Sequence, residues 1–270
     1  MREVHQGEVR GLEEASGGLT RFDIHEGDAI AYSRDCVTSS SVDLIVTDPP
    51  YESLEKHRKS GTTTRLTNSK GSSNVWFPVI KNALFVDFFT EWMRILKPGR
   101  HLYVFCDPET SYEIVPIARS VGWRWGNRLI WDKMTIGMGY HYRRRYEDIL
   151  FFTHPKGKKR RLADLGISDV LSCKRLKGKA YYPTEKPVPV IEVLVQQSSE
   201  RGELVFDPFT GSGSTGEAAL INGRRFLGSD VTPEAVRRAT ERLASPFLPC
   251  RPEGQVVRLM SPHTFLKAAA

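Results

Sequence analysis

The chain has 270 residues, of which 40% are hydrophobic, which is enough for one sizeable α/β core. Its formal charge of +7 and its pI of about 9.2 favour a polyanionic partner. The cysteines and histidines show no metal-ligand spacing, so we expect no metal site. The N-terminus lacks the apolar stretch of a signal peptide, and no apolar run is long enough to cross a membrane, so we expect a cytoplasmic protein with no membrane partner.

Short apolar segments that predict strands recur along the chain and alternate with helical patterns. The predicted strands are Phe22–His25, Val42–Thr47, His101–Cys106, Arg128–Trp131, Ile149–Thr153, Leu204–Phe206 and Arg225–Gly228. The predicted helices are Ala83–Leu96, Pro187–Ser198, Thr215–Asn222 and Pro233–Leu243. This alternation predicts an α/β fold with a mostly parallel, doubly wound sheet.

Segments outside this pattern set the predicted domain boundaries. We expect an N-terminal arm at residues 1–20, the main domain at 21–245 and a C-terminal tail at 246–270. Within the domain, residues 52–78 are polar and too long for an ordinary connection, which favours a functional loop facing a ligand. Residues 154–180 are basic with little apolar content, and this composition predicts an insert.

The tetrapeptide Asp48-Pro49-Pro50-Tyr51 directly follows a predicted buried strand. Ligands of open parallel sheets bind beyond the carboxyl ends of the strands. Two prolines fix φ and remove two backbone donors, so the turn displays a carboxylate, carbonyl oxygens and a phenol ring. Such a site suits an aromatic ring that carries an N–H donor, as a nucleic-acid base does.

A glycine-containing turn, Asp207-Pro208-Phe209-Thr210-Gly211-Ser212-Gly213-Ser214-Thr215, lies between a predicted strand and a predicted helix. The glycines permit a tight turn and close approach of the backbone to a ligand. Asp230 ends the next predicted strand, 17 residues after Gly213. This spacing is close to the one at which an acidic residue holds ribose hydroxyls in dinucleotide-binding folds.

These two segments together resemble the amino-methyltransferase family of DNA modification enzymes. The resemblance runs from about Asp23 to Leu243, and it is to the subgroup in which the catalytic half precedes the cofactor half. Further similar segments are Gly27-Asp28, Leu96-Lys97-Pro98-Gly99 and Tyr182-Pro183-Thr184-Glu185-Lys186-Pro187. The resemblance implies a circularly permuted Rossmann-like fold, a mostly parallel seven-stranded sheet with helices on both faces, and S-adenosyl-L-methionine as the cofactor.

The resemblance also implies where the cofactor binds. Asp28 would lie near its adenine amine, Asp230 would hold its ribose, and the glycine turn would surround its methionine end. The implied cofactor-binding residues are Asp28, Lys186, Asp207, Phe209, Gly211, Gly213, Thr215 and Asp230. Tyr182, Glu185 and Asp230 depart from the residues most frequent in the family at their positions, which are His, Gln and Glu.

The predicted catalytic residues are Asp48, Pro49, Pro50 and Tyr51. Asp48 and the carbonyl group of Pro49 would accept the two hydrogens of an exocyclic base amine, so that its nitrogen attacks the methyl donor directly. The base must leave the duplex for this reaction, and Tyr51 can stack on the flipped base. The proline turn holds no cysteine nucleophile, which excludes methylation at C5 of cytosine.

Basic residues concentrate between His141 and Lys179, a segment that contains twelve Lys and Arg but only four Asp and Glu. The residues expected to hold phosphates of duplex DNA are Arg143, Arg144, Arg145, Lys156, Lys158, Lys159, Arg160 and Arg161. Residues 154–180 take the place of the family's target-recognition segment. They are few, which indicates either a short recognition site or help from a second subunit of a homodimer.

Adenine N6 is the predicted target, because a serine in place of Asp48 is the more usual mark of the enzymes that act on N4 of cytosine. Three alternatives stay open: a cytosine-N4 enzyme, a methyltransferase that acts on RNA, and an inactive nucleic-acid-binding module. The sequence does not decide between an orphan enzyme and one with a restriction endonuclease partner.

Overall fold

The computed structural model describes residues 21–54, 79–137, 141–176 and 185–259. The predicted N-terminal arm, most of the predicted loop at 52–78, and Tyr182 lie outside the described residues. No helix in the described ranges is both long enough and apolar enough to cross a membrane.

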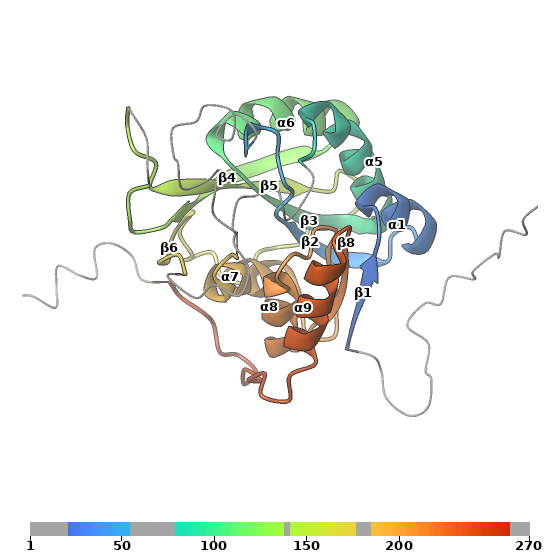
Figure 1. Ribbon diagram of the computed structural model, residues 1–270, viewed down its shortest axis with the longest axis vertical. Coiled ribbons are helices and arrows are strands. Elements are labelled where there is room, and N and C mark those ends of the chain that lie inside the picture. Colours follow the sequence, from blue (N-terminus) through green and yellow to red (C-terminus); the bar gives the residue numbers. More distant parts are fainter. Residues whose placement is uncertain (1–20, 55–78, 138–140, 177–184, 260–270) are drawn as a thin grey trace, which may run out of the picture.

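One sheet of eight strands forms the centre of the molecule (Figure 1). Its strands are β1 (Phe22–Glu26), β2 (Val42–Thr47), β3 (Leu96–Cys106), β4 (Arg124–Asp132), β5 (Tyr146–Thr153), β6 (Val170–Ser172), β7 (Leu204–Asp207) and β8 (Arg225–Asp230). Their order is β1-β8-β7-β2-β3-β5-β4-β6, and only β5 runs antiparallel to its neighbours. The mostly parallel sheet is therefore confirmed, with eight strands where the sequence predicted seven.

The additional strand, β6, lies in the segment 154–180 that the sequence predicted to be an insert. β6 pairs in parallel with β4, where Trp131 lies opposite Leu171. Ile167 packs against the same hydrophobic cluster as Leu171, and the backbone N–H of Ala163 donates to the carbonyl of Gln197. The described part of this segment therefore belongs to the domain itself, and its short apolar run was too weak a signal to predict the strand.

Helices cover both faces of the sheet, as predicted. They are α1 (Ala29–Cys36), the 3-10 turn η1 (Asn82–Leu84), α5 (Phe85–Ile95), α6 (Pro108–Val121), α7 (Val188–Ser198), α8 (Ser214–Ile221) and α9 (Pro233–Leu243). Helices α1, α5 and α6 pack on one face, and α7, α8 and α9 pack on the other (Figure 1). The described part of the predicted C-terminal tail, residues 246–259, continues the second layer, because Leu248, Val257 and Leu259 pack against its cluster.

The central strand β2 explains why this arrangement is stable. All six of its residues are buried, as expected for a strand of a parallel sheet that is covered on both faces. Ile45 points into the cluster under α1 and α5, whereas Leu44 and Val46 point into the cluster under α7 and α8. The apolar run that predicted this strand is thus a consequence of its position between two helical layers.

Two helices that the sequence analysis missed, α1 and α6, both begin at an aspartate cap. The Asp28 carboxylate accepts hydrogen bonds from the backbone N–H groups of Ile30 and Ala31. The Asp107 carboxylate accepts one from Thr110, with Pro108 in the first turn. Both are standard signals of a helix N-terminus and were available in the sequence.

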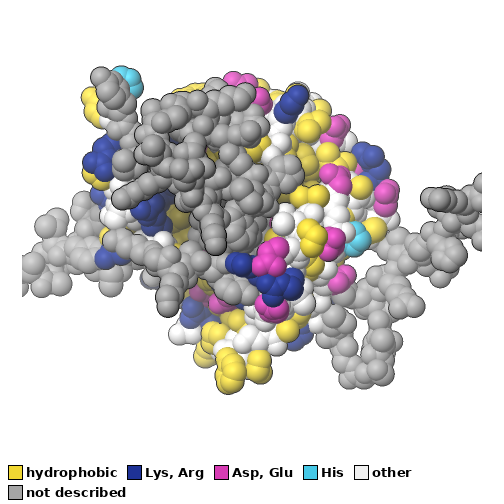
Figure 2. All heavy atoms as spheres, viewed as in Figure 1, with side chains coloured by type: hydrophobic (Ala, Val, Ile, Leu, Met, Phe, Trp, Pro, Cys, Tyr) yellow, Lys and Arg dark blue, Asp and Glu magenta, His cyan; other side chains and the backbone are white. Residues whose placement is uncertain are grey.

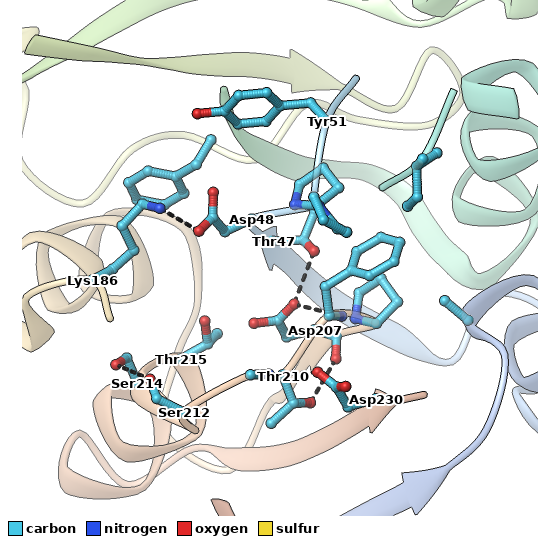
Figure 3. Close-up of a pocket in the computed structure, with 18 of the residues that line it drawn as sticks. Thr47, Asp48, Tyr51, Lys186, Asp207, Thr210, Ser212, Ser214, Thr215 and Asp230 are labelled. Atoms are coloured by element: carbon cyan, nitrogen blue, oxygen red, sulfur yellow. Dashed lines mark hydrogen bonds and ion pairs between the residues drawn. The ribbon is translucent and has the colours of Figure 1, made fainter. Parts of the chain in front are cut away.

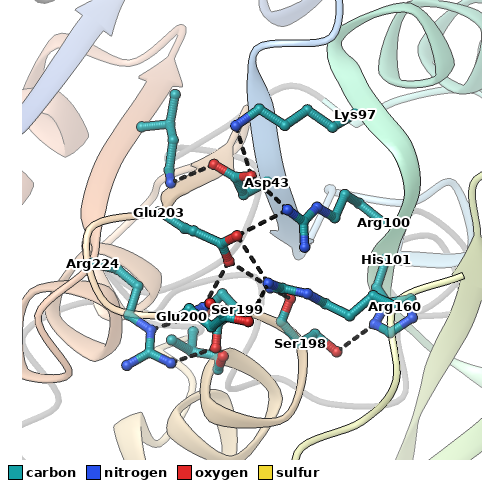
Figure 4. A network of polar contacts seen from close by, with 12 residues as sticks. Asp43, Lys97, Arg100, His101, Arg160, Ser198, Ser199, Glu200, Glu203 and Arg224 are labelled. Atoms are coloured by element: carbon teal, nitrogen blue, oxygen red, sulfur yellow. Dashed lines mark hydrogen bonds and ion pairs between the residues drawn. The ribbon is translucent and has the colours of Figure 1, made fainter. Parts of the chain in front are cut away.

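A network of polar contacts joins β3 and α7 to the segment 154–163 at the amino edge of the sheet, where the parallel strands begin (Figure 4). The guanidinium group of Arg160 donates to Glu203 at 2.9 Å, to Glu200 at 3.0 Å and to the carbonyl of Ser198 at 2.9 Å. Its side chain is only 10% exposed. Burial lowers the pKa of the neighbouring His101 to about 4, so its ring is neutral when it shares a hydrogen bond with Ser198.

Replacing Arg160 should therefore destabilise the fold. In Arg160→Ala, the Glu203 carboxylate stays largely buried without its main counter-charge, and we expect a loss of about 3 kcal/mol in the free energy of unfolding. The matched control is Arg161→Ala, whose exposed side chain should change this free energy by less than about 0.5 kcal/mol. Urea unfolding measures the free energy of unfolding of both variants. If Arg160→Ala loses as little of this free energy as the control, the network adds no stability.

Candidate functional site

The candidate site is a pocket of about 450 Å³ at the carboxyl edge of the sheet, where the parallel strands end (Figure 3). It lies at the point where β2 and β7 are neighbours. The chain leaves these two strands toward opposite ends of the sheet, because β3 lies on the far side of β2 and β8 on the far side of β7. Such a switch point is the usual place for a ligand in an open α/β sheet.

The pocket brings together eleven of the twelve residues that were predicted to act in catalysis or cofactor binding. These eleven are Asp28, Asp48, Pro49, Pro50, Tyr51, Lys186, Asp207, Phe209, Gly211, Thr215 and Asp230. Gly213 does not line it. A Cβ atom at Gly213 would lie 3.1 Å from the Cβ of Ala239 in α9, and its φ is +81°. Gly213 therefore serves the turn and the packing of α9, and its assignment to cofactor binding stays a prediction.

The two predicted motifs are joined directly below the pocket. The Thr47 hydroxyl group donates to the Asp207 carboxylate at 2.8 Å, although 160 positions separate the two residues. The backbone N–H of Phe209 donates to the same carboxylate oxygen. Burial raises the pKa of Asp207 to about 7, while hydrogen bonds from its neighbours act to lower it. Asp207 therefore titrates near neutral pH.

The glycine turn is held closed by Asp230 at the end of β8. The N–H groups of Gly211 and Thr232 each donate to one oxygen of the Asp230 carboxylate, both at 2.9 Å. Gly211 has a φ of +49°, which only a residue tolerant of the left-handed region can adopt. The Asp230 carboxylate is thus fixed in the wall of the pocket, beside the Asp28 carboxylate that caps α1.

Asp48 points across the pocket toward Lys186, and the ammonium group of Lys186 donates to its Oδ2 atom (Figure 3). Among the described residues, the Oδ1 atom of Asp48 and the carbonyl oxygen of Pro49 have no hydrogen-bond partner. The carbonyl oxygen of Pro50, by contrast, accepts from the N–H of Ile80 at 2.7 Å. Two acceptors of the turn are thus available to a ligand.

Tyr51 lies beside Asp48 at the wall of the pocket. Only 8% of its surface is exposed, and it belongs to the hydrophobic cluster under α1 and α5. Burial raises the pKa of its hydroxyl group. Tyr51 therefore packs in the core and also lines the pocket.

Lys133 and Glu147 are pocket residues that the sequence analysis did not predict. Lys133 follows β4 and Glu147 lies near the start of β5, and their side chains form an ion pair at 2.6 Å. Lys186 lies 3.5 Å from the other oxygen of Glu147. Their signal in the sequence is a charged residue at the end of an apolar strand, which is too common to identify a site by itself.

The predicted DNA-binding residues fall into two groups at opposite edges of the sheet. Arg143, Arg144 and Arg145 lie in the connection between β4 and β5, at the carboxyl edge where the pocket opens. The second group follows the end of β5, where the backbone N–H of Arg160 donates to the carbonyl of Gly99. It consists of Lys156, Lys158, Lys159, Arg160 and Arg161. Because β5 is antiparallel, this second group lies at the amino edge, roughly 23 Å of strand away from the pocket.

The second group thus lies away from the pocket, and its contact with DNA stays a prediction. Arg160 is, in addition, already bonded to Glu203 and Glu200. Arg143 donates to the carbonyl of Gly137, Arg144 pairs with Asp107 and Arg145 pairs with Asp132. The side chains of Arg144 and Arg145 are still 46% and 50% exposed, so this group can meet a phosphate backbone near the pocket.

Comparison with known proteins agrees with this site. A family model described as DNA methylase, whose label covers N6 and N4 methyltransferases, matches residues 42–241. The chain is 29% identical to the type II methyltransferase M.HpaI of Haemophilus parainfluenzae, over 77% of this chain and 70% of that protein. It is 26% identical to the DNA adenine methyltransferase YhdJ of Escherichia coli K12, over 86% of both chains.

Solved structures show the same fold. The M1.HpyAVI–SAM complex superposes with a TM-score of 0.62 at 21% identity, covering 83% of this chain and all of that one. The cytosine-N4-specific PvuII DNA methyltransferase superposes with a TM-score of 0.65 at 15% identity, covering 84% and 88%. The match of the family model over most of the chain, together with the joined motifs at the switch point, shows that this protein belongs to the DNA methylase family of amino-methyltransferases.

Proposed function

We propose that this protein transfers a methyl group from S-adenosyl-L-methionine to an exocyclic amine in duplex DNA, with N6 of adenine as the target. The observation that carries the proposal is the state of Asp48. One of its carboxylate oxygens is fixed by Lys186, while the other faces a pocket that it shares with the glycine turn. An acceptor held in this way beside a cofactor site suits a reaction at an N–H group.

The residues around the pocket fit the methyl donor. Its α-amine is a cation and its ribose offers two hydroxyl donors, and the pocket wall presents the carboxylates of Asp207 and Asp230 for these groups. We assign Asp28 to the adenine end, and Phe209, Gly211 and Thr215 to the methionine end. Lys186 contacts Asp48 in this structure, so we assign it to the catalytic half and not to the cofactor. When bound, the cofactor supplies a methyl group on a sulfonium centre.

The chain's own residues prepare the amine for attack. The lone pair of an exocyclic amine is delocalised into the ring, which makes the nitrogen a poor nucleophile. Hydrogen bonds from the amine to Asp48 and to the Pro49 carbonyl, out of the ring plane, favour a tetrahedral nitrogen. Holding this nitrogen in line with the methyl group supplies a large part of the rate. Burial raises the pKa of Asp48 against the opposing effect of Lys186, so its carboxylate is also a reasonable acceptor for the proton that the nitrogen loses.

The target base must leave the duplex to reach Asp48, at a cost of a few kcal/mol. Tyr51 lines the pocket next to Asp48, and stacking on an aromatic ring returns about 1–3 kcal/mol. We therefore propose that the flipped base stacks on Tyr51.

Adenine is the proposed base because an aspartate begins the proline turn, and because the chain is similar over most of its length to YhdJ, which is named as an adenine methyltransferase. N4 of cytosine is the second candidate, since the family covers both activities. The likeness to the PvuII enzyme, at 15% identity, concerns the fold only. A cytoplasmic location, a second subunit and a restriction endonuclease partner stay predictions.

DNA would approach across the carboxyl edge of the sheet. In Figure 2, several Lys and Arg side chains lie on the left of the molecule, on the side where β4 and β5 lie in Figure 1, and others lie in the lower centre beside acidic side chains. Arg143, Arg144 and Arg145 belong to the connection between these strands. We propose that these three arginines bind phosphates beside the flipped base.

The first test is Asp48→Ala, expressed beside the wild type in a host that lacks DNA methylation. Wild-type protein should produce N6-methyladenine in hydrolysed genomic DNA, detected by liquid chromatography and mass spectrometry. The variant should lose at least about 10²–10³-fold in rate, because a fixed acceptor for the amine is gone. Asp230→Ala is the control, since it should weaken cofactor binding, which Asp48→Ala should not. N4-methylcytosine in place of N6-methyladenine would establish the second candidate.

The second test concerns the pH dependence of Asp207. Because burial raises its pKa to about 7 in the folded protein, the carboxyl group contributes stability below its unfolded pKa of about 4, and this stability is lost as the pH rises through 7. Cofactor affinity should change in the opposite sense, rising with pH as the carboxyl group ionises to meet the amine. Asp207→Asn should remove both dependences, as measured by thermal unfolding and calorimetry between about pH 5 and 8. Unchanged profiles would mean that Asp207 is ionised throughout this range.

The third test separates the two basic groups. Replacing Arg143, Arg144 and Arg145 by Ala should flatten the salt dependence of DNA binding by up to about 0.9 in the log–log slope for each phosphate that the variant no longer neutralises. Replacing Lys156, Lys158 and Lys159 by Ala removes the same charge at the amino edge and should leave the slope unchanged. A flatter slope in the lysine variant would show that DNA reaches the amino edge.

A further inference from the structure

Four charged side chains in the pocket form a chain of alternating sign. Lys133 lies 2.6 Å from the Oε1 atom of Glu147, Lys186 lies 3.5 Å from its Oε2 atom, and Lys186 also contacts Asp48. The four residues come from four separate segments, which follow β4, begin β5, precede α7 and follow β2. Their side chains are between 11% and 25% exposed. Each oxygen of Glu147 thus holds one lysine, and only Lys186 reaches Asp48.

Two aromatic rings hold the lysines from the sheet side. The ammonium group of Lys186 lies 5.6 Å from the ring centre of Phe105, and that of Lys133 lies 5.5 Å from the ring centre of Trp131. A cation in this position is attracted by the negative face of the ring, more strongly when it is partly desolvated. The lysines are therefore placed by strands β3 and β4 as well as by their carboxylate partners.

The charges in this chain depend on one another. Burial opposes the charge on Lys186, but the carboxylates of Asp48 and Glu147 outweigh it and raise its pKa. Burial likewise acts against the Glu147 carboxylate, but Lys186 and Lys133 outweigh it and lower its pKa. With two cations and two anions the group is neutral as a whole. Removal of the Glu147 charge alone would leave two ammonium groups close together with only Asp48 to balance them.

We infer that Lys133 and Glu147 are positioning residues for methyl transfer, which act through Lys186 to keep Asp48 ionised and one of its oxygens turned toward the base amine. The inference rests on the proposed function. Lys186 fixes the Oδ2 atom of Asp48, and Glu147 fixes Lys186 in the charged state that can do so. Lys133 balances the charge of Glu147 and prevents it from drawing Lys186 away from Asp48.

The decisive experiment is a rescue by a second substitution. Glu147→Gln leaves Lys133 and Lys186 facing each other without their shared carboxylate, and we expect its single-turnover methylation rate to fall about 10²-fold, in the range found for loss of one group that positions charge. The double variant Lys133→Met/Glu147→Gln removes one cation with one anion and leaves the neutral pair of Lys186 and Asp48. Its rate should return to within about tenfold of the wild type. A residue that touched the base or only supported the fold would not be rescued by losing a second pocket residue.

A titration of Lys186 in the protein without cofactor tests the same inference independently of catalysis. Lysine labelled with 13C at Cε reports its ionisation by NMR, and Lys186→Met assigns the signal. In the wild type, Lys186 should stay charged beyond about pH 10, because its two carboxylate partners hold its pKa above the ordinary value of lysine. In the double variant, where Asp48 remains as its partner, Lys186 should stay charged up to about pH 10. In Glu147→Gln the pKa of Lys186 should fall below the ordinary value of lysine, because the charge of the neighbouring Lys133 ammonium group is no longer neutralised. The methylation rate of this variant should then decline at alkaline pH, which the other two proteins should not show.

Two controls separate a structural effect from a positioning effect. Glu113→Gln makes the same substitution at an exposed site on α6 and should match the wild type in rate and in thermal unfolding. Glu147→Asp keeps the charge with a shorter reach, so it should retain an intermediate rate without an alkaline decline, and it serves if Glu147→Gln does not fold.

The outcomes distinguish this inference from the proposed function. If wild-type protein methylates DNA but Glu147→Gln matches it in rate and in Lys186 titration, the inference is overturned and the function stands. If Glu147→Gln is impaired and the double variant is equally impaired, Glu147 acts directly or structurally, and the inference is again overturned. If the wild type methylates no DNA, the proposed function fails, while the titration still reports whether Glu147 governs Lys186.

Discussion

The parallel pairing of β2 with β7 is the constraint on which the rest of the site depends. These strands end side by side, so Asp48 and Asp207 lie at one edge although they are far apart in the sequence. The Thr47 hydroxyl group at the end of β2 donates to the Asp207 carboxylate at the end of β7. Both strands are buried in the centre of the sheet, between the two helical layers. The switch point between them is therefore rigid, and a target amine and a methyl donor bound there would be held in a fixed geometry, which is the condition for positioning to contribute to rate.

The two edges of the sheet carry charge for different purposes. At the amino edge, Arg160, Arg100 and Glu203 close a network that ties the segment after β5 to α7, and its members are mostly shielded from solvent. At the carboxyl edge, ion pairs surround a pocket. There the Lys186 contact is arranged so that one oxygen of Asp48 is fixed while its second oxygen faces the cavity. Similar residue types thus close a buried network at one edge and surround a pocket at the other.

The balanced charges of Lys133, Glu147, Lys186 and Asp48 have a consequence for the proposed reaction. The methyl donor is a cation and the product cofactor is neutral, so the pocket must accept a change of one unit of charge during each turnover. A group of two lysines and two carboxylates would keep Asp48 ionised until the methyl group is transferred, because each charge is stabilised by a neighbour of opposite sign. Asp48 could then accept the proton that the amine nitrogen loses. Asp207, whose pKa burial raises to about 7, is a carboxylate in the pocket whose ionisation would respond to the charge of a bound ligand.

The amino-acid sequence predicted the turns at 48–51 and 207–215 and the strands that precede them, because a short motif directly after a buried strand must lie at the carboxyl edge of a parallel sheet. It also predicted α9 to the residue, and α7 and α8 to within one residue at each end. Only the tertiary structure brought Lys133 and Glu147 into the pocket, since charged residues at the ends of separate strands carry no information about which of them will meet. Only the structure divided the basic residues between two edges. The reason is the reversed direction of β5, which places residues at its start beside the pocket and residues after its end at the opposite edge.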